Sequence, residues 1–300
     1  MALPKRIVFF WAQGAKEAPS LVRRCWRAWE EKNPGWEIVI ADSFMAQKAF
    51  ATAKISQVPK TVQGQADIFR VIDLAAHGGV YVDAATIPIV PLDEWIHGRV
   101  AAGAFAFHDP YRRRSVENWF LACIAGDAIM EGWADHMRSY WDRPRVVQTR
   151  KRSLDTGLTG AWSAWRDARG IDKPNGAAGT TGRLKRVIEP RDRIWAVDPN
   201  GGAQRPLHPY FWPHYLFDLM LHNDPELREA WAQMPKIPSY KELMIRHWKH
   251  RYAQMTDNDI DTLMAGSQMQ KLALNKTPSL AQMSRIFEVA GLSAYNDGQL

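Results

Sequence analysis

The hydrophobic and polar positions of the first forty residues follow two different periods. Residues 6–11 form a continuous apolar run, which is typical of a strand buried on both faces of a sheet. After Pro19, apolar side chains recur every three or four positions, which predicts a helix that ends at the Asn-Pro-Gly turn of residues 33–35. Residues 36–41 then return to a strand pattern. This order predicts a β-α-β unit, for which a parallel sheet with helices on its faces is the simplest architecture.

A second helix and a second strand lead to a single aspartate. The helical pattern resumes at Gln65, and Gly78 with Gly79 supplies its stop. Residues 80–82 then read as a short strand that delivers Asp83 to its carboxyl end. Because ligands in open α/β sheets bind beyond the carboxyl ends of the strands, Asp83 is predicted to lie at a binding edge.

The rest of the chain is predicted to be mainly helical. Helical patterns cover residues 117–125, 132–141, 240–255 and 279–290, and the glycine-rich stretch 172–182 is predicted to be a surface connection or a lid. We expect a catalytic α/β domain over residues 1–238, with a mostly parallel sheet, and a C-terminal helical extension over residues 239–300 that packs on it.

Composition places the protein in a reducing compartment. The chain has 300 residues, 46% of them hydrophobic, which is enough for a substantial core. Cys25 and Cys123 lie among apolar neighbours and are expected to be reduced. The apolar start is too short for a signal peptide, and no run approaches the roughly 18 apolar residues that span a bilayer. We expect a cytoplasmic protein that is soluble or attached to the inner face of the membrane.

The net charge of +7 indicates a partner that carries phosphate. The excess lies in Arg112, Arg113 and Arg114 and in the stretch 138–152. Anionic lipid, a charged small substrate or an ordinary solvated face are all consistent with it. Nucleic acid is not expected, because the sequence has no reading helix, zinc site or RNA-binding aromatic motif.

Four blocks in order resemble a known family. The block ADIFRVIDLAAHGGVYVD, residues 66–83, resembles the signature of nucleotide-sugar-dependent glycosyltransferases with the GT-A fold. It is most similar to the capsular polysaccharide synthesis glycosyltransferase family, which is related to the DXD-containing glycosyltransferase family 32. The opening block 3–42, the block ENWFLACIAGD at 117–127 and the aromatic block 210–231 resemble the same family, so that most of residues 3–240 is covered.

The resemblance implies a nucleotide-sugar donor seated across the first strand and the Asp83 loop. It implies donor-binding roles for Trp11, Gln13, Asp67, Arg70, Gly78, Gly79, Tyr81, Asn118 and Lys271. Read from the residues alone, several have a structural alternative. The tryptophan can be a core residue, Asp67 and Arg70 an ordinary helix salt bridge, the glycines a helix stop and Asn118 a helix cap.

The acidic motif is incomplete for a metal site. Asp83 matches the first acid of the family's motif, but Ala85 stands at the second position and Thr86 comes one place late. Asp83 can still hold Mn²⁺ or Mg²⁺ if diphosphate oxygens and waters complete the shell, or it can bind the sugar by hydrogen bonds alone. A metal-independent variant would need fixed cations, for which His214 and Lys271 are the candidates. We take Asp83 and His214 as the candidate catalytic residues, although an isolated histidine among aromatic residues is also typical of a core position.

The family resemblance implies a glycosyltransferase that moves a sugar, expected from a UDP-sugar, to a hydroxyl of a capsular or other cell-surface glycan, with retention of anomeric configuration. The acceptor can be lipid-linked, and an anionic membrane surface would suit the basic charge. The alternative is a non-catalytic protein that binds a nucleotide sugar or a glycan through a degenerate acidic motif.

Overall fold

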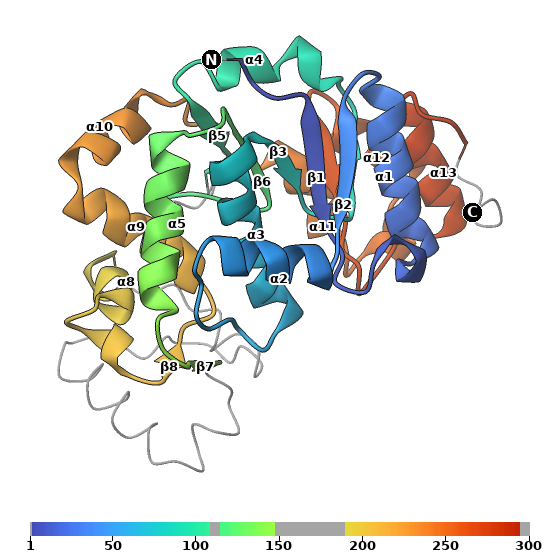
Figure 1. The fold of residues 1–300 in the computed structure, drawn as a ribbon. Coiled ribbons are helices and arrows are strands. Elements are labelled where there is room, and N and C mark those ends of the chain that lie inside the picture. Colours follow the sequence, from blue (N-terminus) through green and yellow to red (C-terminus); the bar gives the residue numbers. More distant parts are fainter. Residues whose placement is uncertain (1, 109–114, 148–189, 295–300) are drawn as a thin grey trace.

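The computed structural model describes residues 2–108, 115–147 and 190–294. Its centre is a five-stranded sheet in the order β2-β1-β3-β6-β5 (Figure 1). The strands are β1 (Arg6–Phe10), β2 (Glu37–Ala41), β3 (Gly79–Val82), β5 (Ala104–Ala106) and β6 (Phe120–Cys123). β1 is parallel to both β2 and β3, and β6 is antiparallel to β3 and to β5. All strands except β6 therefore run in one direction, which confirms the predicted α/β class.

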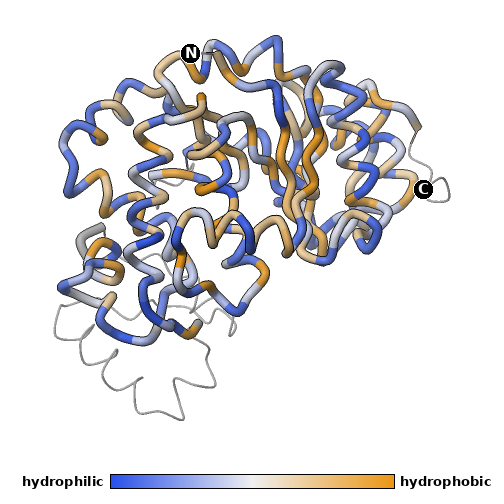
Figure 2. Tube along the Cα trace, viewed as in Figure 1, coloured by the Kyte–Doolittle hydropathy of each residue, from blue (hydrophilic) through white to orange (hydrophobic). Residues whose placement is uncertain are grey.

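Helices cover both faces of this sheet because its strands are apolar on both sides. In β1, Val8 and Phe10 join the core beneath α2 (Ser43–Thr52), α3 (Val62–His77) and α5 (Ala128–Tyr140). Ile7 and Phe9 join a second core beneath α1 (Ser20–Lys32), η2 (Leu92–Glu94) and α4 (Ile96–Arg99). Figure 2 shows the apolar residues gathered along the central strands. The short 3₁₀ turn η1 (Ala15–Glu17) links β1 to α1.

The helix before Asp83 has clear start and stop signals. Thr61 caps α3 by accepting a hydrogen bond from the backbone N–H of Gly64 at 3.2 Å. At the other end, Gly78 has a φ of 64° and donates its N–H to the carbonyl of Leu74 at 2.8 Å. The predicted helix and its glycine stop are confirmed, and the helix begins three residues earlier than the pattern from Gln65 indicated.

Two further groups of elements complete the described chain. A helical group beside α5 consists of α8 (Pro190–Val197), η3 (Gly202–Gln204), α9 (Trp212–Asn223) and α10 (Pro225–Gln233), with the short pair β7 (Val146–Val147) and β8 (Leu207–His208). The C-terminal group consists of η4 (Lys241–Leu243), α11 (Met244–His247), η5 (Tyr252–Gln254), α12 (Asp257–Met264), β9 (Met269–Lys271) and α13 (Leu280–Val289).

The C-terminal residues are joined to the sheet domain by a strand pair as well as by helix packing. β9 pairs antiparallel with β4 (Thr86–Pro88), so that Thr86 lies opposite Lys271. α12 and α13 share a core with α1 and with Ile87 of β4. The range of the predicted extension, 239–300, contains α11, α12 and α13, and it also supplies the strand β9, which pairs with β4 just after Asp83.

Two predicted helices are wrong. Residues 117–125 contain β6, a strand whose residues are buried on both faces between β3 and β5. A short apolar run has no period that separates a buried strand from a buried helix, and the tertiary pairing decided here. Residues 240–255 do not form one helix but the separate turns η4, α11 and η5.

Three further expectations concern membrane spans, the cysteines and the glycine-rich and basic segments. The described helices are all too short or too polar to cross a bilayer. Both cysteines are buried and free, as expected. The glycine-rich loop 172–182, Arg112 to Arg114 and part of the basic stretch 138–152 lie outside the described residues.

Candidate functional site

Asp83 lies directly after β3, at the edge where the parallel strands end. Its backbone N–H donates to the carbonyl of Trp119 at 2.8 Å, and 28% of its side chain is exposed. One carboxylate oxygen, Oδ1, accepts from Arg70 Nη1 at 3.2 Å, and the other, Oδ2, accepts from Lys271 Nζ at 2.6 Å. Burial would raise the pKa of Asp83, but the charges of Lys271 and Arg70 outweigh it and lower the pKa. Asp83 is therefore a carboxylate with a cation on each oxygen.

Arg70 is a buried organiser of this site. Its Nε donates to the carbonyl of Ala66 at 3.0 Å, its Nη1 also donates to the carbonyl of Asn118, and its Nη2 lies 3.2 Å from Asp67 Oδ1. The guanidinium stacks on the ring of Tyr81, 4.6 Å from the centroid. Nearly all of its N–H groups thus contact other residues of the protein, so the main role of Arg70 is to position the side chains of the site and not to bind a ligand. Tyr81, itself buried, contributes through Arg70.

Asp67 keeps one carboxylate oxygen for a ligand. Asn118 Nδ2 donates to Asp67 Oδ1 at 2.9 Å, and Arg70 contacts the same oxygen. Within the described part of the chain, Oδ2 of Asp67 has no partner, and 20% of the side chain is exposed. Burial raises the pKa of Asp67 to about 6, although Arg70 opposes the shift. This oxygen can accept a hydrogen bond from a sugar or ribose hydroxyl.

Lys271 reaches Asp83 from the far end of the chain. It follows Gln270 in β9, and neighbouring residues in a strand point to opposite faces. Gln270 is directed into the C-terminal group, where it is fully buried, whereas the ammonium of Lys271 lies against Asp83 and 5.2 Å from the ring centroid of Trp119. Burial lowers the pKa of Lys271, and the nearby Asp83 opposes that shift. Lys271 is therefore the second cation of the cluster, as the sequence allowed.

Trp11 and Gln13 lie at the same edge as Asp83. β1 and β3 pair with Val8 opposite Tyr81, so continuing the register places Trp11 level with Ala84. The Trp11 ring packs edge-on against Trp26, with centroids 6.5 Å apart, and its Nε1 is buried without a hydrogen-bond partner among the residues described. Trp11 is thus both a packing residue and an indole donor beside the site. Gln13 lies in the turn after β1.

The double glycine is at the opposite end of β3. A Cβ on Gly78 would lie 2.6 Å from the backbone nitrogen of Ala125, and one on Gly79 would lie 2.4 Å from Arg6 Cγ. Their φ angles, 64° and 97°, also favour glycine. The close approach that these residues permit is between strands, and the structure does not bring them to Asp83.

His214 is also outside the cluster around Asp83. It is buried on α9, where its ring lies 5.5 Å from the ring of Phe211. α9 packs on α5 and α8, and the cations that contact Asp83 are Arg70 and Lys271. The structure therefore favours the core position that the sequence left open for this histidine.

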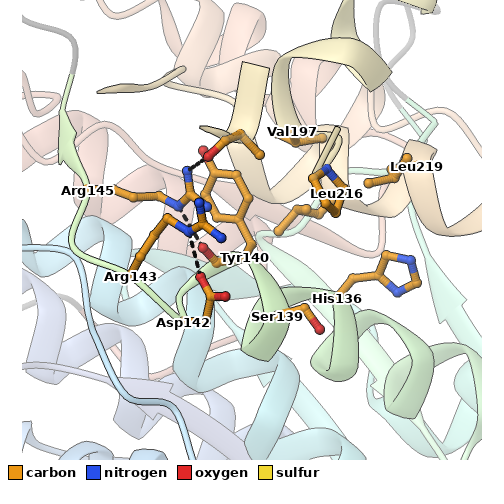
Figure 3. A pocket seen from close by; sticks show the side chains of 11 residues that line it. His136, Ser139, Tyr140, Asp142, Arg143, Arg145, Val197, Leu216 and Leu219 are labelled. Carbon is orange, nitrogen blue, oxygen red and sulfur yellow. Dashed lines mark hydrogen bonds and ion pairs between the residues drawn. The ribbon is translucent and has the colours of Figure 1, made fainter. Parts of the chain in front are cut away.

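A cavity of about 160 Å³ lies elsewhere, between the end of α5 and the α8–η3 segment (Figure 3). Buried Arg145 borders it, donates to the carbonyls of Tyr140 and Ala203, and stacks on the Tyr140 ring at 3.8 Å. This arginine caps the C-terminal end of α5 and ties it to η3. No residue of the Asp83 cluster borders the cavity.

The residues around Asp83 do not fit a divalent metal ion. Both of its oxygens already carry cations, and the residue at the second acidic position, Ala85, has no ligand atom in its side chain. In the described ranges, no three His, Cys, Asp or Glu side chains are grouped as metal ligands. A metal at Asp83 would have to displace Lys271 and would face the positive charge of Arg70 at close range.

Sequence reasoning missed one cation, Arg246. Its charge lowers the pKa of Asp83 after the larger effects of burial, Lys271 and Arg70. It lies on α11, within the stretch that the sequence pattern predicted as one long helix. No motif marked it, because its place depends on how α11 packs against β9.

The chain is similar to sugar transferases in its first half. The family described as capsular polysaccharide synthesis protein matches residues 2–149. This confirms the resemblance of the three blocks within residues 3–127, whereas the aromatic block 210–231 lies outside the match. An initiation-specific alpha-1,6-mannosyltransferase of Candida albicans is 34% identical over 104 residues, which are 31% of this chain and 27% of that protein. A putative glycosyltransferase, HOC1, of Saccharomyces cerevisiae is 31% identical over 97 residues, 29% of this chain and 24% of that protein.

The matched region spans about a quarter of the length of these curated relatives. Among solved structures, the PaToxG glycosyltransferase aligns with 60% of this chain and 83% of its own, at 15% identity and a TM-score of 0.34.

Proposed function

We propose that this chain, whose residues 2–149 match the family described as capsular polysaccharide synthesis protein, is a glycosyltransferase that moves a sugar from a nucleotide-sugar donor to a hydroxyl of a glycan acceptor. The observation that carries the proposal is the polar cluster of Asp83, Arg70, Lys271 and Asp67 at the carboxyl edge of parallel strands. This is the edge at which α/β sheets bind their ligands.

Two members of the cluster, Lys271 and Asp67, and the neighbouring Trp11 have direct tasks in such a reaction. The sugar C1–oxygen bond to the diphosphate breaks and its electron pair stays on the diphosphate. The acceptor oxygen bonds to C1 and gives up its proton to the departing diphosphate, which is the base that the reaction itself supplies. Lys271 offers a fixed positive charge for the departing diphosphate, in a partly dehydrated site where charge stabilisation is strong. Oδ2 of Asp67 accepts a hydrogen bond from a donor hydroxyl and holds the sugar in line. Trp11 offers its indole to the nucleotide.

The donor and the acceptor are proposed from the family resemblance. We expect a UDP-sugar as donor, a capsular or other cell-surface glycan as acceptor, and retention of configuration at C1. A lipid-linked acceptor would give the net charge of +7 a purpose, because a basic surface is attracted to anionic membranes. Sedimentation with vesicles tests this part, and equal binding to anionic and neutral lipid would refute it.

The experiment for the proposed function is a donor screen. Release of nucleoside diphosphate from a panel of UDP- and GDP-sugars is measured for the wild type and for Asp83→Ala, with Asp93→Ala as a control on an exposed carboxylate. We expect turnover with at least one donor, a loss of at least about a hundredfold in Asp83→Ala, and no change in the control. Unchanged turnover in Asp83→Ala would show that the site is wrong.

Because Ala85 replaces the second acid of the motif, a non-catalytic binding function is a second candidate, and the same donor panel tests it. A protein that binds nucleotide sugars without turning any of them over would be the non-catalytic alternative. Thermal shift with the same panel separates the two cases, because a ligand stabilises the folded state whether or not it reacts.

A further inference from the structure

We propose that Lys271 and Arg246, and not a divalent metal ion, hold the diphosphate of the donor. The inference rests on the proposed function and specifies how that site neutralises its most charged group.

The first step concerns the carboxylate that a metal would need. Oδ2 of Asp83 lies 2.6 Å from Lys271 Nζ, and Oδ1 lies 3.2 Å from Arg70 Nη1. Both cations are well buried, with side-chain exposures of 13% and 6%. A metal would bind within about 2.0–2.6 Å of the same oxygens, so it would have to expel an ammonium that is already seated there. Asp83 thus acts as the counterion that positions Lys271.

The second step concerns the second acidic position, Ala85, and Gln270 of β9, which offer a metal no free side-chain oxygen. Ala85 is buried, and its carbonyl accepts from the backbone N–H of Leu272 at 2.8 Å. The Gln270 amide nitrogen donates to Lys241 O at 2.7 Å and to Ser267 Oγ at 2.9 Å, facing away from Asp83. Neither position can complete a shell around a metal at Asp83.

The third step identifies Arg246 as the available cation. The backbone N–H of Ile245 donates to Gln270 Oε1 at 3.1 Å, which ties α11 to β9 through the residues that precede Arg246 and Lys271 in the chain. The charge of Arg246 acts on both Asp83 and Lys271. Within the described ranges its half-buried guanidinium makes no hydrogen bond or ion pair. A half-buried arginine whose N–H groups have no acceptor among the described residues is well suited to phosphate oxygens, which it can bind by two parallel hydrogen bonds.

The charges of the cluster suit a dianion. Arg70, Lys271 and Arg246 are positive, whereas Asp83 is negative and Asp67 has its pKa raised to about 6 by burial. Glu117 acts on Lys271 more weakly than Asp83 does. A donor diphosphate carries two negative charges, which Lys271 and Arg246 can each contact. As the sugar leaves, the electron pair remains on the diphosphate oxygen and the ammonium of Lys271 is at hand to stabilise it.

Calorimetric titration with UDP and with GDP tests the inference, in EDTA and in Mn²⁺. We expect the wild type to bind one of them with the same Kd, within about threefold, in both conditions. Lys271→Met and Arg246→Gln should each weaken that binding by at least about tenfold in EDTA. The matched controls are Lys276→Met and Arg251→Gln, which alter exposed cations of the same C-terminal group and should bind as the wild type does.

The outcomes are distinct. Binding that needs Mn²⁺, or that Mn²⁺ strengthens more than about tenfold, would overturn the metal-free site and leave the glycosyltransferase proposal standing. Wild-type affinity in both Lys271→Met and Arg246→Gln would also overturn it. No binding of either nucleotide in any condition would remove the proposed function together with the inference. Thermal unfolding shows that each variant is folded, and the EDTA comparison on the wild type needs no variant.

Discussion

Removal of the Asp83 carboxylate has a cost that the structure allows us to bound. In Asp83→Ala, the ammonium of Lys271 and the guanidinium of Arg70 lose oxygens at 2.6 and 3.2 Å. Removing one member of a buried ion pair costs about 3–5 kcal/mol, because the other charge is left without a partner in a poorly hydrated place. Asp83 is 28% exposed, so water enters in part, and we expect a loss of about 2–3 kcal/mol in the free energy of unfolding.

The assay is a double-mutant cycle on Asp83 and Lys271. Lys271→Met removes the stranded ammonium, so the double variant should lose less stability than the sum of the two single variants, by about 1–2 kcal/mol. Urea unfolding followed by tryptophan fluorescence measures each free energy, with 14 tryptophans as the signal.

The control cycle uses Lys5 and Asp93, a pair of the same chemistry at 2.8 Å whose side chains are 50% and 44% exposed. Because water and salt screen an exposed pair, its coupling should stay below about 0.5 kcal/mol. If Asp83 and Lys271 were additive to within about 0.5 kcal/mol, the two residues would not interact in the folded protein, and the assigned cluster would be refuted.

Three other changes follow from the same geometry. Burial raises the folded-state pKa of Asp67 from 3.8 to about 6, so the folded protein holds this proton more tightly and its ionisation costs stability as the pH rises from about 4 to 6. The free energy of unfolding of Asp67→Asn should therefore rise by up to about 2 kcal/mol relative to that of the wild type as the pH increases through that window. Urea unfolding measures it, and a difference between the two proteins that stays constant from pH 4 to 7 would contradict the raised pKa of Asp67. Gly79→Ala places a Cβ 2.4 Å from Arg6 Cγ at a φ of 97° and should cost about 2 kcal/mol or more, whereas Gly98→Ala meets open space and should change the midpoint little. Arg70→Lys keeps the charge but loses the forked contacts to two backbone carbonyls and two carboxylates, so it should lower the unfolding free energy by about 2 kcal/mol, and an unchanged midpoint would show that those contacts carry no stability.

The sequence by itself determined the first three strands of the sheet, β1, β2 and β3, and the place of Asp83. The apolar run of β1, the helical spacing of α1 and α3 and the glycine stop at Gly78 are local patterns, and each predicted its element. The carboxyl end of β3 follows from these patterns alone, because a strand after a helix in a parallel sheet must end at the common binding edge. The family resemblance could be seen in the sequence because the matched residues 2–149 include the motifs around β1, α3 and β3.

Only the tertiary structure decided which groups meet Asp83. Lys271 comes from 188 residues farther along the chain, and its approach depends on the pairing of β9 with β4, which no local pattern encodes. Residues 117–125 became the strand β6 because neighbours buried both of its faces. The position of α11, which carries Arg246, depends on a hydrogen bond from Ile245 to Gln270 of β9, 25 residues farther along the chain. Contacts between distant segments depend on packing and burial, and it is these that turn one aspartate into the centre of a cation cluster.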